Sequence, residues 1–192
     1  DVFKNCAKHF TGENDLILTT DSSIVNEYYK LGCKNVLFFP FCCQPIIHNP
    51  VNRKNNNNII FPCSWYSLKY PERCVYMKDM IDMYATKKLD IYDRQFIFNR
   101  LTFQTDDKIV TKYKGWYCFP KEYDHLIKGQ LGYQQTLDQY KTYGIVMNAN
   151  TITDSETMFS RRVIEAFASG CAILTNKSIG MEKMFGDAYI EY

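Results

Sequence analysis

Two arginines and a glutamate lie close together in a segment with a helical apolar pattern. Large apolar side chains recur at four-residue steps from Phe159 to Phe167, which predicts a helix from about Thr157 to Ser169. Arg161 and Arg162 would lie near its amino end, where the helix dipole disfavours cations unless an anion is bound. A helix amino end also offers free amide groups to a phosphate. Together with Glu165, the segment is therefore a candidate anion-binding site.

The loop before this helix is rich in small polar side chains. It follows an apolar strand expected at 145–148, and Asp154, Ser155 or Thr157 can cap the first amides of the helix. In an open parallel sheet, ligands bind beyond the carboxyl ends of the strands. We therefore include Asn148, Asn150, Ser155 and Thr157 among the candidate binding residues.

A second loop of this kind follows the strand expected at 58–63. It contains Ser64, Trp65 and Tyr66, and Pro71 then stands at a plausible first helical position with Arg73 in the first turn. A cation at that position again opposes the helix dipole. The same rule for parallel sheets directs attention to the loops after residues 92 and 175 as well.

Each of these residues also has a purely structural interpretation. Arg161 and Arg162 precede Glu165 by four and three residues, so either could form a helical ion pair worth a few tenths of a kcal/mol. On spacing alone, this ion-pair interpretation is at least as well supported as the anion-binding site. Trp65 and Tyr66 could be packing residues, which is the commoner role of aromatic side chains beside an apolar strand.

The same reservation applies to the remaining cation and to the histidines. Arg73 could pair with Glu72 or with Asp79 on its own helix. The histidines are scattered, and each is interpreted as a surface or packing residue rather than as a ligand or base: His9, His48 and His125.

The segments that must position these residues alternate between strand-like and helix-like patterns. Strands are expected at 16–20, 35–41, 58–63, 89–92, near 116, at 145–148 and at 171–175, with helices at 21–31, 71–86, 134–143, 157–169 and from about 180. This alternation predicts an α/β fold with a doubly wound parallel sheet.

The polar tract from Arg53 to Asn58, with four consecutive asparagines, predicts an exposed linker between two domains. We therefore divide the chain into residues 1–48, a linker at 49–57 and a larger domain at 58–192. Because no initiator Met opens the chain and it stops just after a helical start, we expect a piece clipped at both ends.

Composition narrows the possible partners and the location. The 192 residues are 46% hydrophobic, and a net charge of +2 gives no field strong enough to predict nucleic acid as a partner. The eight cysteines show no C-x-x-C spacing, which argues against a metal site. Their even number could mean four disulfides, but a chain of this size does not need them, which favours reduced thiols. No signal peptide is recognised, and the longest apolar run, 36–43, is too short to cross a bilayer. We expect a cytoplasmic protein, either free or peripheral at the inner membrane face.

Several familiar motifs are absent from the sequence. There is no G-x-G-x-x-G, Walker loop, G-x-S-x-G elbow or H-E-x-x-H, so dinucleotide enzymes, P-loop enzymes, α/β-hydrolases and zincins lose their usual support. No D-x-D tripeptide occurs either, which argues against metal-dependent GT-A glycosyltransferases.

The segment from Asn148 to Gly170 reads N-A-N-T-I-T-D-S-E-T-M-F-S-R-R-V-I-E-A-F-A-S-G, and C-A-I-L-T-N and G-M-E-K-M-F follow it. This run resembles the signature of the CgeB-like (spore-maturation) glycosyltransferases. Earlier segments are also similar to parts of that family: T-T-D-S-S-I-V-N-E-Y-Y-K-L-G near the start, I-I-F-P-C-S-W-Y-S-L-K-Y-P-E-R (59–73), I-Y-D-R (91–94) and F-P-K-E-Y (119–123). The likeness extends over nearly the whole chain, and 148–170 is its most specific part.

The resemblance implies a GT-B fold, in which two Rossmann-like domains face each other across a cleft. It implies that residues 1–48 end an acceptor-side domain, that 58–192 bind a nucleoside-diphosphate sugar, and that no metal or other cofactor is needed. Glu165 matches the position that holds the donor ribose in related enzymes. Retaining GT-B enzymes carry two glutamates separated by seven residues, and Thr157 stands where the first of them would be, which leaves sugar recognition and stereochemistry open.

Two functions of different classes follow from this comparison. The first is transfer of a sugar to a cell-surface polymer, protein or glycan acceptor, with Arg161, Arg162, Arg73 and the helix amides stabilising the leaving diphosphate. The alternative is a non-catalytic GT-B-like module that binds nucleotide or glycan in surface-layer assembly. No general base is assigned.

Overall fold

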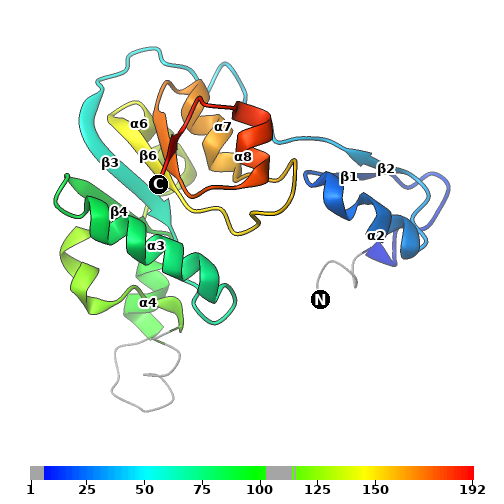
Figure 1. Cartoon of the computed structure of the whole chain (residues 1–192), viewed down its shortest axis with the longest axis horizontal. Helices are drawn as coiled ribbons and strands as arrows, with labels where there is room; N and C mark the ends of the chain where they lie inside the picture. Colours follow the sequence, from blue (N-terminus) through cyan, green and yellow to red (C-terminus); the bar gives the residue numbers. More distant parts are fainter. Residues whose placement is uncertain (1–6, 103–113, 115) are drawn as a thin grey trace.

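The computed structural model describes residues 7–102, 114 and 116–192, and in it the chain forms two units of unequal size (Figure 1). In the smaller unit, β1 (Ile17–Thr19) pairs in parallel with β2 (Val36–Phe38). A 3-10 turn, η1 (Ser22–Ile24), and helix α2 (Val25–Lys30) connect the two strands. Asp21 caps the turn by accepting a hydrogen bond from the Ser23 amide, and Gly32 follows α2 with a φ of 92°, as expected for a glycine that ends a helix.

The larger unit is built on a six-stranded parallel sheet. Its strands are β3 (Asn56–Cys63), β4 (Leu89–Asp93), β5 (Ile127–Gly129), β6 (Tyr143–Asn148), β7 (Ala172–Thr175) and β8 (Ile190–Glu191). They lie in the order β5-β4-β3-β6-β7-β8, and every neighbouring pair is parallel. Counted from β3, this is the strand order 3-2-1-4-5-6 of a Rossmann-type sheet. The chain is therefore an α/β protein with a Rossmann-like sheet, as the sequence predicted.

Helices cover both faces of this sheet. They are α3 (Pro71–Tyr84), α4 (Phe96–Thr102), η2 (Lys121–Leu126), α6 (Tyr133–Tyr140), α7 (Arg161–Ala168) and α8 (Ile179–Phe185). Side chains of β3 alternate between two cores: Ile59, Phe61 and Cys63 pack with residues of α3 and η2, whereas Ile60 packs with residues of α6, α7 and α8. Alternation with a period of two is what the pleat of a strand imposes, so the doubly wound arrangement follows from the apolar run of β3.

The asparagine tract is largely exposed, as its composition predicted, but part of it belongs to a strand. Strand β3 begins inside the tract, at Asn56. The amide of Lys54 donates to the carbonyl of Lys141, in the turn between α6 and β6, at 2.8 Å. Arg53 donates to the carbonyl oxygens of Ser169 and Tyr143, each at 2.9 Å. Polar side chains could not reveal these contacts, because the tract is ordered by backbone bonds and one arginine.

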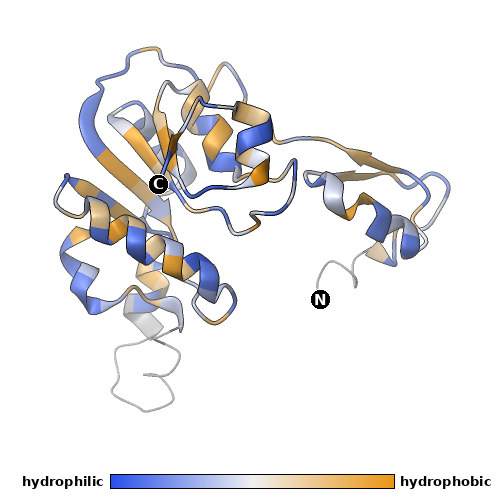
Figure 2. Ribbon diagram, viewed as in Figure 1, coloured by the Kyte–Doolittle hydropathy of each residue, from blue (hydrophilic) through white to orange (hydrophobic). Residues whose placement is uncertain are grey.

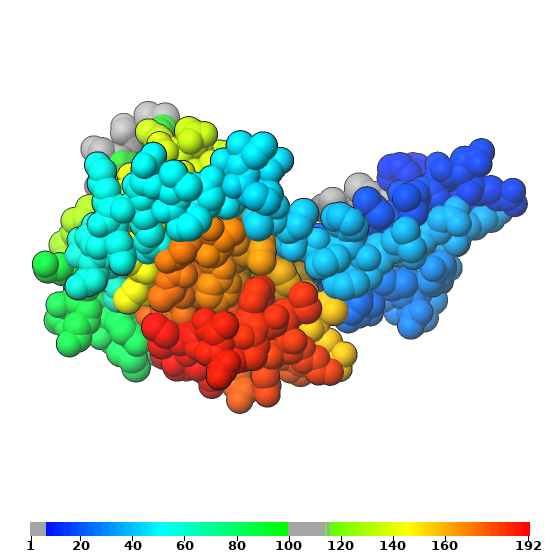
Figure 3. Space-filling model, turned by 90° about the horizontal axis from the view of Figure 1, so that it is seen from above, coloured from blue at the N-terminus to red at the C-terminus, as the bar shows by residue number. Residues whose placement is uncertain are grey.

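The two units touch through the loop between β6 and α7. Ser155 Oγ donates to Asp21 Oδ1 at 2.6 Å, and the Ser22 amide donates to Thr157 Oγ1 at 2.8 Å. Seen from above, the smaller unit forms a lobe at one side of the larger one (Figure 3). Its two strands are strongly apolar (Figure 2), although Leu18 and Leu37 are each more than half exposed.

Several boundaries differ from the predicted ones. Helix α7 begins at Arg161 rather than Thr157, because residues before it are engaged by the smaller unit. The helix predicted up to Tyr143 ends at Tyr140, and β6 begins at Tyr143. Trp116 is helical, so the strand expected there is wrong. The short strands β5 and β8 were not predicted, since two or three residues give no usable alternation.

Candidate anion-binding site

A cavity of about 870 Å³ lies beyond the carboxyl ends of β3, β4 and β6, where the strand order reverses. This is the position at which open parallel sheets bind ligands. The loops after β3 and β6 and helices α3, α6 and α7 contribute to its walls. Seven of the eleven predicted binding residues line it: Ser64, Tyr66, Arg73, Asn150, Arg161, Arg162 and Glu165.

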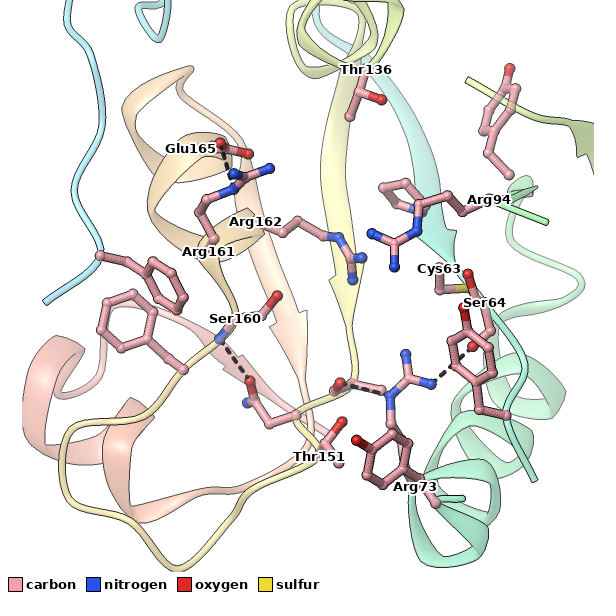
Figure 4. Close-up of a pocket in the computed structure, with 18 of the residues that line it drawn as sticks. Cys63, Ser64, Arg73, Arg94, Thr136, Thr151, Ser160, Arg161, Arg162 and Glu165 are labelled. Atoms are coloured by element: carbon pink, nitrogen blue, oxygen red, sulfur yellow. Dashed lines mark hydrogen bonds and ion pairs between the residues drawn. The ribbon is translucent and has the colours of Figure 1, made fainter. Parts of the chain in front are cut away.

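Three guanidinium groups converge on the cavity from three different elements (Figure 4). Arg73 reaches up from α3, Arg94 follows β4, and Arg162 extends from the first turn of α7. The groups of Arg94 and Arg162 point toward each other across the space (Figure 4). Within the described residues, none of the three arginines forms an ion pair with a carboxylate. Their combined positive charge is thus available to a ligand.

Neutral groups of the protein hold two of the three arginines in place. Arg73 donates from Nη1 to the Ser64 carbonyl at 2.9 Å and from Nε to the Ala149 carbonyl at 3.3 Å. Arg162 Nη1 donates to Asn148 Oδ1 at 3.2 Å. The predicted alternative partners of Arg73, Glu72 and Asp79, are therefore not its partners. For Arg94, the hydrogen bond found among the described residues is that of its backbone amide, which donates to the Cys63 carbonyl at 2.9 Å.

Burial disfavours the charged form of one of these arginines, Arg73. Removal from water lowers the pKa of Arg73, which Cys63 opposes and the charge of Arg162 reinforces. An arginine remains protonated even so. Burial also raises the pKa of the adjacent Cys63 thiol to about 12, against the opposing influence of Arg73 and Arg162. The thiol is consequently a neutral wall of the cavity, and a bound anion would relieve the repulsion between the arginines.

The amino end of α7 opens onto the same cavity. Its N-cap is Ser160, which lines the cavity and makes no side-chain capping bond. The predicted capping residues Asp154, Ser155 and Thr157 do not cap α7, because it begins further along the chain. The Ser160 amide is 3.4 Å from Asn150 Oδ1. The next two amides, those of Arg161 and Arg162, belong to the first turn of α7 beside the cavity. The helix dipole favours a negative charge at this end.

Glu165 is the acidic side chain of the cavity wall. Its Oε1 lies 3.1 Å from Arg161 Nε and 3.3 Å from the hydroxyl of Tyr133, which donates to it. The helical ion pair considered from spacing therefore forms with Arg161 and does not form with Arg162. It is not a surface pair, however, because Glu165 is only 5% exposed. The guanidinium of Arg161 also lies over the Tyr133 ring, 5.7 Å from its centroid.

Four of the predicted residues lie outside the cavity wall. Trp65 packs against Phe119 with ring centroids 5.3 Å apart, so its packing interpretation is correct. Ser155 and Thr157 bind the smaller unit, as described above. Asn148 is buried beneath the cavity, where it holds Arg162.

Sequence reasoning missed three residues of the site. Arg94 follows β4 at the carboxyl edge of the sheet, in a loop that the parallel-sheet rule had marked for inspection, but its charge was not considered there. Tyr133 begins α6 and lines the cavity. The sequence predicts only a surface or packing role for His48; it is buried, and its Nε2 lies 3.7 Å from Glu165 Oε1. No signal in the local sequence connects residue 48 with residue 165.

Comparison with known proteins gives no assignment: no family model matches the chain, and no curated protein does. In the described part of the chain, no helix has the length and apolar character needed to cross a bilayer. Three or more potential metal-ligating side chains do not gather at any point among the described residues.

Proposed function

We propose that the cavity binds the diphosphate of a nucleoside-diphosphate sugar and that the protein is a glycosyltransferase of the GT-B type. The observation that carries this proposal is the convergence of Arg73, Arg94 and Arg162 at the reversal point of a Rossmann-like sheet, where they have no carboxylate partner among the described residues. A diphosphate ester carries two negative charges and many acceptor oxygens. Arginine forks and helix amides are suited to both.

In this proposal, the diphosphate lies between the three guanidinium groups and the first amides of α7. The ribose hydroxyls donate to Glu165, whose buried carboxylate is close to the same helix end. When the sugar–phosphate bond breaks, the departing nucleoside diphosphate gains one more negative charge. Preorganised cations stabilise that charge more strongly than the ground state, which is the condition for catalysis.

The smaller unit would belong to the acceptor-side domain, with a surface polymer, protein or glycan as acceptor. The contact between the smaller unit and Thr157 bears on how the donor sugar is recognised. Thr157 stands where retaining enzymes carry a glutamate, and here its hydroxyl oxygen lies 2.9 Å from Ser22 Oγ. The donor sugar would therefore need another polar group for recognition.

The test is turnover of uridine, guanosine, adenosine and cytidine diphosphate sugars by the intact protein, followed as release of the nucleoside diphosphate. A glycosyltransferase releases it, and faster when acceptor is present. A protein that binds one of these nucleotides tightly but releases no product from any donor, with glycan and polymer acceptors supplied, is the non-catalytic GT-B-like module instead.

A further inference from the structure

His48 is a buried histidine whose ring nitrogens have distinct hydrogen-bonding partners. It lies in the segment that leads from the smaller unit to β3, and it is 6% exposed. Its Nδ1 accepts a hydrogen bond from the Gln44 amide at 2.9 Å. A ring nitrogen that accepts a bond from an N–H group carries no hydrogen of its own, so Nε2 is the donor nitrogen of the ring.

This Nε2–H group faces the site glutamate through one tyrosine. Nε2 lies 3.1 Å from the Tyr133 hydroxyl and 3.7 Å from Glu165 Oε1. The Tyr133 hydroxyl has one proton, which it donates to Glu165 Oε1 at 3.3 Å. Its oxygen is therefore left to accept from His48. The three side chains form a one-directional chain of hydrogen bonds from His48 through Tyr133 to Glu165.

In the described part of the chain, the hydrogen bonds and ion pairs of the Glu165 carboxylate all involve one of its two oxygens. Tyr133 donates to Oε1, and Arg161 Nε pairs with it at 3.1 Å. Among the described residues, Oε2 makes no hydrogen bond or ion pair. The side chain of Arg161 is 59% exposed, so this arginine alone would hold the carboxylate loosely. His48 is 6% exposed whereas Tyr133 is 52% exposed, so the buried histidine, acting through Tyr133, supplies the rigid part of the support.

We propose that His48 is a positioning residue: through Tyr133 it orients Glu165 so that Oε2 is presented to a pair of neighbouring hydroxyl groups on the ligand. This inference rests on the proposed function, in which those hydroxyls belong to the ribose of the nucleotide. Because His48 lies on the segment between the two units, it also connects that segment to the ribose-binding carboxylate. Preorganised carboxylates lose less freedom on binding and therefore discriminate better.

The experiment compares each nucleoside diphosphate with its 2′-deoxy form by calorimetric titration. Wild-type protein should prefer the ribonucleotide about tenfold or more, the scale of one charge-assisted hydrogen bond. In His48→Ala and in Tyr133→Phe, this preference should fall to about threefold or less. His48→Gln, which keeps a donor and an acceptor, should recover part of it. His125→Ala, an exposed histidine on η2, serves as the control and should keep the wild-type preference.

A merely structural role for His48 gives a different result. Lost stability would weaken ribo- and deoxynucleotide binding equally and leave their ratio unchanged. An unchanged ratio in folded His48→Ala and Tyr133→Phe would overturn the positioning role while leaving the proposed function intact. Nitrogen NMR showing His48 protonated on Nδ1 would also overturn it. If wild-type protein binds none of the nucleoside diphosphates, the proposed function fails, and the ribose assignment fails with it.

Discussion

Arg162 is held by Asn148, with 3.2 Å between its Nη1 and the side-chain oxygen of the asparagine. Asn148 is completely buried at the end of β6, and its amide nitrogen donates to Asn150 Oδ1 at 2.9 Å and to Thr175 Oγ1 at 3.1 Å. Arg162 is thus held by a side chain at the carboxyl end of β6 rather than by its own helix. A small polar cluster of β6 and β7 sets the geometry of the site.

Replacing Asn148 with Ala should therefore affect both folding and binding. Loss of these buried hydrogen bonds should lower the free energy of unfolding by about 1–3 kcal/mol, measured by urea denaturation. Arg162 would lose the anchor that Asn148 provides, so nucleoside diphosphate affinity should fall as well. Gln134→Ala, an exposed amide on α6, is the comparison and should change neither. Wild-type affinity in Asn148→Ala would show that Arg162 needs no anchor from β6.

Arg94 separates binding from stability most cleanly, because its guanidinium has no side-chain partner among the described residues. Arg94→Ala should leave the unfolding free energy within about 0.5 kcal/mol of wild type. Nucleoside diphosphate affinity should fall about tenfold to a hundredfold, corresponding to one charge-assisted hydrogen bond. Calorimetric titration measures the loss.

The matched control for Arg94 is Lys87→Ala. Lys87 is exposed in the turn before β4, near the amino end of that strand and away from the cavity. Its replacement by Ala changes the net charge as much as Arg94→Ala does. It should leave affinity unchanged. Equal losses in the two variants would mean that only the overall charge attracts the nucleotide.

Gly180 tests the packing that supports the loop before α7. A Cβ at this position would collide with the backbone oxygen of Met158, which cannot move away as a flexible side chain could. Gly180→Ala should therefore lower the melting temperature, with a cost of about 1–3 kcal/mol. At Gly132, an added Cβ would meet only the end of the Gln135 side chain, at 3.4 Å. Gly132→Ala should be nearly neutral, and a similar result for Gly180→Ala would contradict the close packing of α8 against this loop.

The cysteines should differ strongly in reactivity. Those in the described residues are all free thiols; Cys6 lies outside these residues. Cys42 is exposed and should be alkylated first in the native protein, whereas Cys63 should resist until unfolding. Thiols titrated in the denatured, unreduced protein should number eight, the full count of the sequence. Rapid alkylation of native Cys63 at neutral pH would contradict its burial.

The raised pKa of Cys63 also gives a pH dependence of stability. Its folded-state pKa, about 12, exceeds the ordinary value of 9.0, so the folded chain holds this proton more tightly than the unfolded chain does. Its contribution is complete below pH 9 and is lost as pH rises from about 9 toward 12. Denaturation of Cys63→Ala should show a weaker alkaline decline than wild type. Identical alkaline profiles would argue against this assignment.

The apolar runs at β3, β4, β6 and β7 were sufficient to predict a parallel α/β sheet. Ile59 to Phe61 and Val146 to Met147 are continuous apolar stretches, as strands buried on both faces require. Strand order was beyond this reasoning, since nothing in a local pattern states which strands pair. The start of α7 was misplaced for a related reason. Thr157 has good capping chemistry, but its hydroxyl is used by Ser22, which is remote in sequence.

The candidate site was predictable where charge and helix position coincided. Arg162 and Glu165 were found because they share one helix with an amino end facing the cavity. His48 was not found, because its connection to Glu165 exists only once the segment between the units has folded against α6 and α7. A polar residue that acts through tertiary contacts gives no periodic signal.

The most direct test of the account is calorimetric titration of the four nucleoside diphosphates against wild type, Arg162→Ala and Glu165→Gln. One diphosphate should bind wild type, and each substitution should weaken it by about 1.5–3 kcal/mol, roughly tenfold to a hundredfold. Because Glu165 is buried and paired with Arg161, Glu165→Gln should also lower stability modestly, so folding is verified first. Wild-type affinity retained in both folded variants, or no binding of any diphosphate by wild type, would contradict placing the nucleotide in this cavity.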